Sequence, residues 1–252
     1  MIEYSIVIPA YNEADKITAS LTQVINFMKS FSERFEIIVV DDGSKDKTVE
    51  VVEGYALSNP EIHLIKNPHK GKSPSVWTGV NEAHGEYIYL ADADLAAPIT
   101  ELKKLSIWVK DQNYDIVIAS REGMGASRIG EPFYRHLMGR VFNFVVQVIA
   151  LPGINDSQCG FKLFKGAVAK DLFSRLKVYG ASAPEIKKAY FGAFDVEVLY
   201  LAKKLKYSVK EVPVTWTYVK TNRVSPFIDS IKMFSDVVKI KLNDLRGVYG
   251  KL

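Results

Sequence analysis

The sequence predicts an α/β fold with a mostly parallel central sheet flanked by helices. Its first 120 residues alternate short β-rich runs with helical patterns, a rhythm typical of strands that pair in parallel. Of its 252 residues, 48% are hydrophobic and 25% are charged, as in ordinary globular proteins. A chain of this length and composition is expected to bury a sizeable core.

Five runs in the first half are expected to be strands. They cover residues 4–8, 36–40, 62–65, 87–90 and 116–119. Between the first two runs, apolar residues recur at intervals of three or four, as one buried helix face requires. These residues are Ile17, Leu21, Val24 and Met28. Similar helical patterns cover 48–57, 76–83 and 101–110.

After Arg121 a glycine-rich loop leads to a helix expected from about Pro132, because proline suits a first helical turn. Further elements are a strand near 160–164, a helix over 195–205, a strand over 208–214 and a helical tail. No repeat or linker interrupts the pattern. We therefore expect one domain over 1–252, with a nucleotide-binding half at 1–120 and an acceptor-binding half at 121–252.

Bulk properties exclude several classes of protein. The single cysteine, Cys159, rules out an intrachain disulfide and a multi-cysteine metal site, so a cytoplasmic location is expected. A net charge of +4 is too small to indicate nucleic acid as a partner. The most apolar stretch, 142–151, is much shorter than the roughly 20 residues that a membrane-spanning helix needs. No feature indicates an oligomeric state.

Polar residues follow several of the expected strands. Ligands of open α/β sheets bind at the carboxyl ends of strands, which directs attention to 9–13, 41–44, 92–94 and 120–121. Neither the dinucleotide-binding glycine fingerprint nor the P-loop motif is present, which disfavours a dehydrogenase. Acidic residues at a nucleotide site are explained if a divalent cation bridges them to a diphosphate.

The triplet Asp92-Ala93-Asp94 is the first candidate site. Side chains alternate along extended chain, so Asp92 and Asp94 face the same way and can share one hard cation, while small Ala93 lets the backbone approach a ligand. An isolated triplet of this kind is more often a solvated turn or a helix cap. Its meaning therefore depends on the other strand ends.

Three further positions carry competing interpretations. Asp41 and Asp42 fit a helix cap and turn, or a carboxylate that accepts the N3–H of uracil. Glu13 can bind the base or the ribose hydroxyls. Lys72 precedes a helical pattern and can meet a phosphate at the helix N-terminus, although a solvated loop lysine is the commoner case.

Four segments together resemble the inverting family 2 glycosyltransferases of GT-A fold. They are Pro9-Ala10-Tyr11-Asn12-Glu13, the run from Val40 to Thr48, Gly71-Lys72 and Asp92-Ala93-Asp94. The segments 92–98, 151–164 and 194–197 are similar to the polyprenyl-phosphate branch of that family, especially its dolichyl-phosphate β-glucosyltransferases. The resemblance runs through almost the whole chain.

The resemblance implies a UDP-sugar donor, with UDP-glucose favoured, a Mg²⁺ or Mn²⁺ ion and a polyprenyl phosphate acceptor. It assigns the metal to Asp94 with Asp92, and sugar orientation to Asp195 and Glu197. It assigns nucleotide-sugar binding to Pro9, Tyr11, Glu13, Asp41, Asp42, Lys72, Asp92 and Ala93. Two positions depart from the family. Ala96 replaces a glutamine of the mannosyl enzymes, which favours glucose, and Ser73 replaces the second glycine of a Gly-Lys-Gly loop.

The acceptor phosphate has a second pKa of about 6, so it is mostly a dianion at neutral pH and already a nucleophile. Asp156 is therefore expected to orient the acceptor or a sugar hydroxyl, with no strong general base required. Guanidinium groups suit phosphate. The expected ligands of the acceptor or the diphosphate are Arg121, Arg128, Arg135, Lys220 and Arg223.

Two helical segments combine apolar stripes with basic residues, namely 132–150 and the tail. Both fit either core packing or contact with a membrane surface, which predicts a peripheral protein at the cytoplasmic face of a membrane. Alternative functions are mannosyl transfer from GDP-mannose, transfer to a soluble acceptor, nucleotidyl transfer and non-catalytic nucleotide-sugar binding. Nucleotidylyltransferases normally carry a glycine-rich basic loop where 9–13 stand here.

Overall fold

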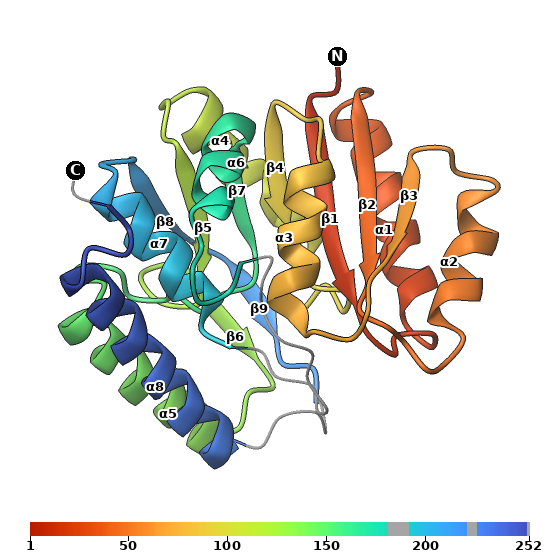
Figure 1. Cartoon of the computed structure of the whole chain (residues 1–252). Helices are drawn as coiled ribbons and strands as arrows, with labels where there is room; N and C mark the ends of the chain where they lie inside the picture. The colour runs from red at the N-terminus through yellow and green to blue at the C-terminus, as the bar shows by residue number, and fades with distance from the viewer. Residues whose placement is uncertain (181–191, 221–225, 251–252) are drawn as a thin grey trace.

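The computed structural model describes residues 1–180, 192–220 and 226–250, and it is built on a seven-stranded sheet with the order β3-β2-β1-β4-β7-β5-β8 (Figure 1). The strands are β1 (Tyr4–Ala10), β2 (Phe35–Asp41), β3 (Ile62–Lys66), β4 (Tyr87–Leu90), β5 (Ile116–Ser120), β7 (Lys162–Lys165) and β8 (Val209–Pro213). Neighbouring strands run parallel except at β7, which is antiparallel to β4 and β5. The expected α/β fold with a mostly parallel sheet is confirmed.

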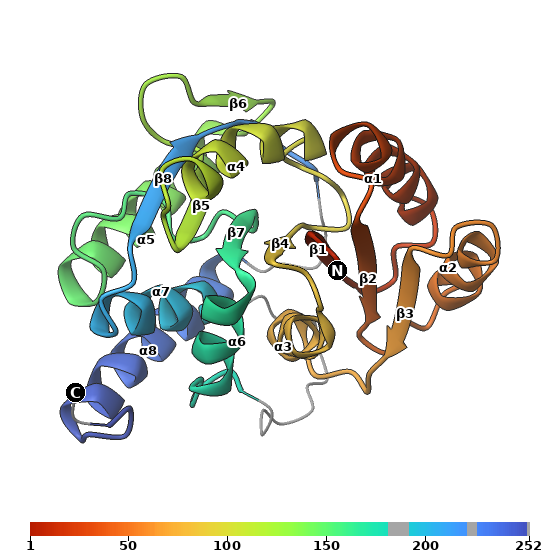
Figure 2. The same ribbon diagram turned by 90° about the horizontal axis from the view of Figure 1, so that it is seen from above.

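Helices cover both faces of the sheet, as Figure 2 shows from above. One face carries α1 (Ile17–Phe31), α2 (Thr48–Ala56), the 3-10 turn η1 (Ile99–Glu101) and α4 (Leu102–Lys110). The other carries α3 (Lys72–Glu82), α6 (Gly166–Ser174) and α7 (Phe194–Lys204). A strand that helices cover on both faces carries apolar residues at nearly every position, instead of apolar and polar residues in alternation. This explains the apolar composition of β1 and β2.

The core divides into two clusters because successive side chains of a strand point to opposite faces. Ile6 and Ile8 of β1 pack with α1 in one cluster, whereas Val7 packs with α3 in the other. The contact of Val7 with α3 is close. A Cβ on Gly79 of that helix would lie 2.4 Å from a methyl carbon of Val7, so glycine is needed where helix and sheet meet.

Four elements differ from the sequence-based expectations. The strand expected at 160–164 is β7, which lies antiparallel between β4 and β5 with Lys162 opposite Leu90. Helix α6 and a small two-stranded sheet of β6 (Ser127–Ile129) and β9 (Thr215–Thr217) were not anticipated. The Thr217 N–H donates to the Ala96 carbonyl at 2.7 Å, so β9 is attached to the loop that follows β4.

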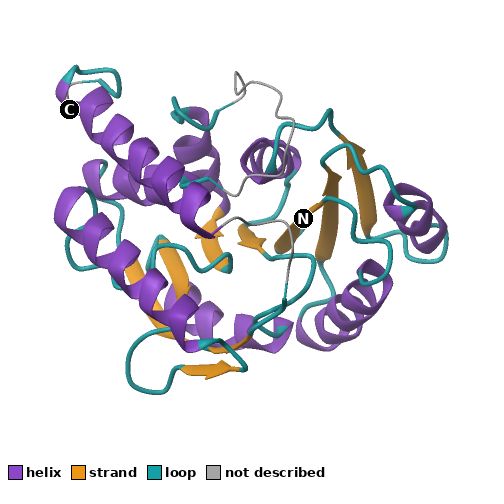
Figure 3. Cartoon of the chain, turned by 90° about the horizontal axis from the view of Figure 1, so that it is seen from below, coloured by secondary structure: helices purple, strands orange, loops and turns teal. Residues whose placement is uncertain are grey.

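The helices α5 (Phe133–Ile149) and α8 (Pro226–Leu245) pack against each other at one side of the molecule (Figures 1 and 3). Helix α5 buries only Asn143 and Val146, and large apolar side chains face solvent, with Phe133 78%, Phe144 67% and Val148 69% exposed. Ile231 and Leu245 of α8 are exposed as well. Within the described residues, no helix has the length and apolar character to cross a bilayer.

Candidate active site

The loops after β1 and β2 are joined at the carboxyl edge of the sheet. The Asn12 N–H donates to Ser44 Oγ at 2.8 Å, and Asn12 Oδ1 accepts the Lys45 N–H at 2.7 Å. The Glu13 N–H donates to Thr48 Oγ1 at 2.8 Å. These bonds hold the segment from Pro9 to Glu13 beside the acidic end of β2, as the parallel pairing of the two strands predicts.

The carboxylate of Asp42 accepts hydrogen bonds from a neighbouring loop of the protein. It accepts hydrogen bonds from the backbone N–H groups of Lys70 at 2.8 Å and Gly71 at 2.9 Å, and from His69 Nδ1 at 2.8 Å. The His69 ring in turn stacks on Tyr11, with centroids 4.2 Å apart. Asp42 therefore fixes the conformation of the 69–71 loop, and Tyr11 packs against this loop through the His69 ring.

Asp41 differs from Asp42 because only one of its two carboxylate oxygens accepts a hydrogen bond from the described residues. Oδ2 accepts the Ser44 N–H at 3.0 Å, whereas the buried Oδ1 has no hydrogen-bond partner among the described residues. The residue is only 2% exposed. A buried carboxylate oxygen without a donor is costly, so Oδ1 is suited to accept a hydrogen bond from a ligand.

The acidic triplet follows β4 and is held from both sides. Ser20 Oγ of α1 donates to the Ala93 carbonyl at 2.6 Å, and Asp94 Oδ1 accepts the Ala96 N–H at 3.1 Å. On the other side, a Cβ on Gly160 would lie 2.3 Å from Asp92 Oδ2. Burial and the negative charge of Asp92 raise the pKa of Asp94, as expected for two carboxylates that lie close together.

Lys72 brings a positive charge to this acidic cluster. It is the first residue of α3, which begins four residues before the expected pattern, and its ammonium group contacts Asp92 Oδ1. Burial opposes the charged form, but the carboxylates of Asp92 and Asp195 outweigh that effect and raise the pKa of Lys72. Lys72 is therefore a mostly buried cation held among carboxylates.

The donor set fits a hard divalent cation that also binds a ligand. Asp92 and Asp94 offer carboxylate oxygens, which Mg²⁺ and Mn²⁺ prefer. In the part of the chain that the structure describes, no group of three or more His, Cys, Asp or Glu residues can hold a metal ion. The two carboxylates of Asp92 and Asp94 instead match the usual magnesium arrangement, in which one or two carboxylates are completed by substrate phosphates.

Asp195 and Glu197 both contact protein partners. Lys162 Nζ lies 2.5 Å from Asp195 Oδ1 and also donates to the Cys159 carbonyl, and the Lys162 and Asp195 side chains are almost fully buried. Glu197 accepts backbone hydrogen bonds from residues 177–179 and one from the Tyr249 hydroxyl at 2.7 Å. Lys162 was missed from the sequence, where a lysine in an apolar strand was the only signal.

Asp156 and Arg121 form a buried pair beside the site. The backbone N–H, Nε and Nη2 of Arg121 donate to the Asp156 carboxylate, each at 2.8 Å. Burial opposes ionisation, but Arg121 outweighs it and lowers the pKa of Asp156 to about 2. The guanidinium also lies over the Trp216 ring at 5.4 Å. Asp156 is thus ionised at neutral pH and holds Arg121 in one orientation.

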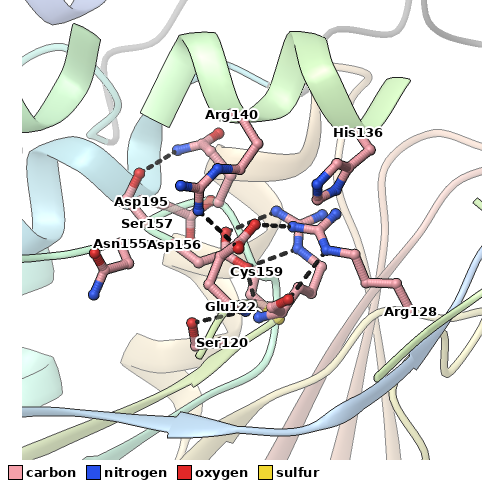
Figure 4. A network of polar contacts seen from close by, with 12 residues as sticks. Ser120, Glu122, Arg128, His136, Arg140, Asn155, Asp156, Ser157, Cys159 and Asp195 are labelled. Atoms are coloured by element: carbon pink, nitrogen blue, oxygen red, sulfur yellow. Dashed lines mark hydrogen bonds and ion pairs between the residues drawn. The ribbon is translucent and has the colours of Figure 1, made fainter. Parts of the chain in front are cut away.

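The pair of Arg121 and Asp156 belongs to a larger network of charged groups. In this network Glu122 lies between Arg128 and Arg140 (Figure 4). Arg128 contacts Glu122 and Glu131 at 2.6 Å each, and its Nε donates to the Arg121 carbonyl at 3.1 Å. Sequence reasoning overlooked both glutamates, although they stand among the arginines it selected. The carboxylates preorganise the guanidinium groups.

Two further basic candidates, Arg135 and Lys220, lie near β9 and the segment that follows it. The Arg135 guanidinium lies 5.1 Å from the centre of the Tyr218 ring, and the Tyr218 N–H donates to the carbonyl of Ile129 in β6. Lys220 is exposed at the end of the same segment. Arg223 lies outside the described residues.

The chain combines a mostly parallel sheet with an acidic triplet after β4 and, at the end of β2, a buried carboxylate oxygen without a partner among the described residues, and its fold is of the GT-A type. Glycosyl transferase family 2 matches residues 5–173, and the chain belongs to that family. It is a glycosyltransferase.

Among its relatives is the dolichyl-phosphate beta-glucosyltransferase of Dictyostelium discoideum, which is 34% identical over 98% of this chain and 76% of its own length. The human protein of the same name is 32% identical over 98% of this chain and 77% of its own length. The Saccharomyces cerevisiae protein is 33% identical over 97% of this chain and 76% of its own length.

Solved structures share the fold at lower identity. Glucosyl-3-phosphoglycerate synthase from Mycobacterium tuberculosis, in complex with Mn²⁺, UDP-glucose and phosphoglyceric acid, has a TM-score of 0.62 at 17% identity and covers 96% of this chain and 79% of its own. A mannosyltransferase from Pyrobaculum calidifontis, in complex with GDP-mannose and Mn²⁺, has a TM-score of 0.61 at 19% identity, covering 94% and 64%.

Proposed function

We propose that this chain transfers glucose from UDP-glucose to a dolichyl-type polyprenyl phosphate, with inversion at the anomeric carbon. The supporting observation is its similarity, over 98% of its length, to relatives named dolichyl-phosphate beta-glucosyltransferase. The alternative donor is GDP-mannose. Alanine at position 96, where the mannosyl enzymes carry glutamine, favours glucose.

The donor is proposed to bind across the ends of β1, β2 and β4. Asp41 Oδ1 accepts the uracil N3–H, which supplies the partner that this buried oxygen lacks among the described residues. Pro9, Tyr11 and Glu13 line the base and ribose, and the backbone at Ala93 lies against the donor. Asp42 contributes indirectly, by holding the loop that leads to Lys72.

The diphosphate is proposed to lie between Lys72 at the start of α3 and the acidic triplet. Asp94, supported by Asp92, would hold the divalent cation, which when bound stabilises the negative charge of the departing UDP. The amide dipoles at the helix N-terminus favour the same anion. Asp195 and Glu197 act as positioning residues, because their carboxylates are engaged by Lys162 and by the 177–179 backbone.

The acceptor phosphate is proposed to bind at Arg121, Arg128 and Arg135, and Lys220 and Arg223 are proposed to bind the donor diphosphate. The phosphate is mostly dianionic at neutral pH and attacks the anomeric carbon in line as UDP leaves. Asp156 is a positioning residue in this scheme. Its pKa of about 2 and its three bonds to Arg121 favour orientation of the guanidinium over proton abstraction.

The exposed apolar side chains of α5 and α8 are proposed to rest on the cytoplasmic face of a membrane, which would bring the lipid acceptor to the arginines. A cavity of about 430 Å³ between these helices and α7 is lined by Lys203, Lys204 and Lys241, which suit acidic headgroups. Phe144→Asp, at an exposed position of α5, should reduce flotation with anionic vesicles. The control Leu57→Asp, at an exposed position after α2, should not. Equal flotation of both variants would contradict this membrane face.

One assay tests the proposed reaction. Turnover is measured with UDP-glucose, GDP-mannose and UDP-N-acetylglucosamine, each with and without Mn²⁺ and a short polyprenyl phosphate. We expect product only with UDP-glucose, cation and lipid acceptor together. Preference for GDP-mannose would overturn the donor, and turnover unaffected by any polyprenyl phosphate would overturn the acceptor in favour of a soluble one.

A further inference from the structure

The contact between Lys72 and Asp92 joins two groups with different partners in the proposed reaction. Lys72 begins α3, where the donor diphosphate is proposed to bind, whereas Asp92 belongs to the triplet proposed to hold the cation. An ammonium group and a divalent cation are both attracted to the same carboxylate. The Lys72 ammonium group and a divalent cation would therefore meet at the same Asp92 carboxylate.

We propose that Lys72 and the divalent cation compete for Asp92, and that the donor diphosphate ends this competition by attracting the Lys72 ammonium group to itself. Cation and donor then bind cooperatively because one side chain moves between their sites. This inference rests on the proposed donor site and deepens it, since it assigns Lys72 the coupling between two ligands.

Several contacts define the position of the Lys72 ammonium group. It contacts Asp92 Oδ1, and it lies 6.0 Å from the centre of the Phe194 ring at the start of α7. The negative charges of Asp195 and Asp94 also favour its charged form. Only 18% of the Lys72 side chain is exposed, so its charge is poorly screened by water and acts strongly on Asp92.

The backbone around Asp92 is held in place, and its carboxylate lies against Gly160. Its carboxylate lies so close to Gly160 that a Cβ there would fall 2.3 Å from Oδ2. The backbone of the triplet is tied by the Ser20 bond to Ala93 and by the Leu95 N–H, which donates to the Asp92 carbonyl at 3.0 Å. A cation that approaches Asp92 Oδ1 must therefore displace the ammonium group of Lys72 from this oxygen.

Lys72 itself can move, because a lysine side chain carries its charge on a flexible four-carbon stem. The backbone at its start is fixed by the bonds from Gly71 to Asp42, so only the side chain needs to swing. A diphosphate at the α3 N-terminus offers it more negative charge than Asp92 alone. Two carboxylates are also too few ligands for tight cation binding, which makes the diphosphate oxygens necessary for a second reason.

Binding of Mn²⁺, followed by electron paramagnetic resonance, tests the proposal without any turnover. The wild-type chain is titrated with Mn²⁺ alone, with UDP and with inorganic pyrophosphate, which needs no base recognition. We expect weak binding of Mn²⁺ alone and a gain of roughly ten- to a hundredfold with either diphosphate, as is typical of coupled sites. In Lys72→Met, Mn²⁺ alone should bind about tenfold tighter and the gain should shrink by the same factor.

Two variants separate competition from general electrostatics. Lys70→Met removes an equal charge from a partly exposed position two residues away and should change the affinity for Mn²⁺ much less than Lys72→Met, because Lys72 contacts Asp92 directly. Lys72→Arg keeps a cation on Asp92 and should retain weak binding of Mn²⁺ alone. Thermal unfolding checks that each variant is folded.

The proposal is overturned if Lys72→Met binds Mn²⁺ alone no tighter than wild type, or if Lys70→Met gives the same increase. Its failure is distinguishable from failure of the proposed function. Binding of Mn²⁺ alone involves no sugar, base or lipid, whereas a wrong donor would show as a gain with pyrophosphate and none with UDP.

Discussion

The pair of Asp156 and Arg121 makes a quantitative prediction about stability. Asp156 is fully buried, and its pKa of about 2 lies roughly 1.8 units below the ordinary 3.8. One pKa unit corresponds to roughly 1.4 kcal/mol, so the ionised carboxylate contributes on the order of 2 kcal/mol to the folded state. Asp156→Asn loses this contribution and leaves Arg121 without its counter-charge, so about 3–5 kcal/mol of destabilisation is expected at pH 7.

The pH dependence follows from the direction of the shift. A folded-state pKa below the unfolded value gives stability that is present above about pH 4 and lost as pH falls toward 2. The difference in the free energy of unfolding between wild type and Asp156→Asn should therefore be smaller by roughly 1 kcal/mol at pH 3 than at pH 7. At pH 3 the carboxylate is largely protonated in the unfolded chain, so its ionised form stabilises the folded state less.

Urea unfolding followed by circular dichroism, from pH 7 to pH 3, measures both effects. The matched control is the double variant Arg121→Met with Asp156→Leu, which removes both charges and should recover most of the loss at pH 7. A difference below about 1 kcal/mol at pH 7, or one that stays constant down to pH 3, would refute this account of the pair.

Three predictions concern the donor side. Asp94→Asn should reduce turnover by roughly a hundredfold or more at saturating Mn²⁺ while circular dichroism stays unchanged, because one neutral amide replaces the main cation ligand; wild-type turnover would require another metal site. Asp41→Asn should weaken UDP binding about tenfold in calorimetry, since an amide nitrogen or oxygen replaces a charged acceptor; unchanged affinity would remove Asp41 from base recognition. Gly160→Ala should lower activity and thermal stability, because its Cβ would fall 2.3 Å from Asp92 Oδ2, whereas Gly54→Ala in α2, with nothing within 4 Å, should be neutral or stabilising. Similar behaviour of the two glycine variants would contradict the close packing of Asp92.

Much of the fold was predictable because local patterns and tertiary burial agree. The apolar runs of β1 and β2 and the spacing of Ile17, Leu21 and Val24 indicate elements that the structure contains. The order of polar motifs after parallel strands also placed 9–13, 41–44 and 92–94 at one edge of the sheet. Such features depend on short stretches of chain, where backbone periodicity selects the buried face.

The insertion of β7 could not be foreseen, because the direction of a strand depends on which neighbours pair with it. Its antiparallel placement beside β4 and β5 puts Lys162 next to Asp195 and brings Gly160 against Asp92. No pattern within 160–164 encodes those contacts. They arise from segments far apart in the sequence.

Residue types and their order along the chain were enough to indicate a family 2 glycosyltransferase and to propose carboxylates and arginines for its site. Only the tertiary structure decided which of these charges neutralise one another. Arg121 is held by Asp156, Arg128 by two glutamates, and Lys72 by Asp92. The reason is physical. A motif specifies that a charge is present, but its strength and availability depend on burial and on the nearest opposite charge, and folding alone sets both.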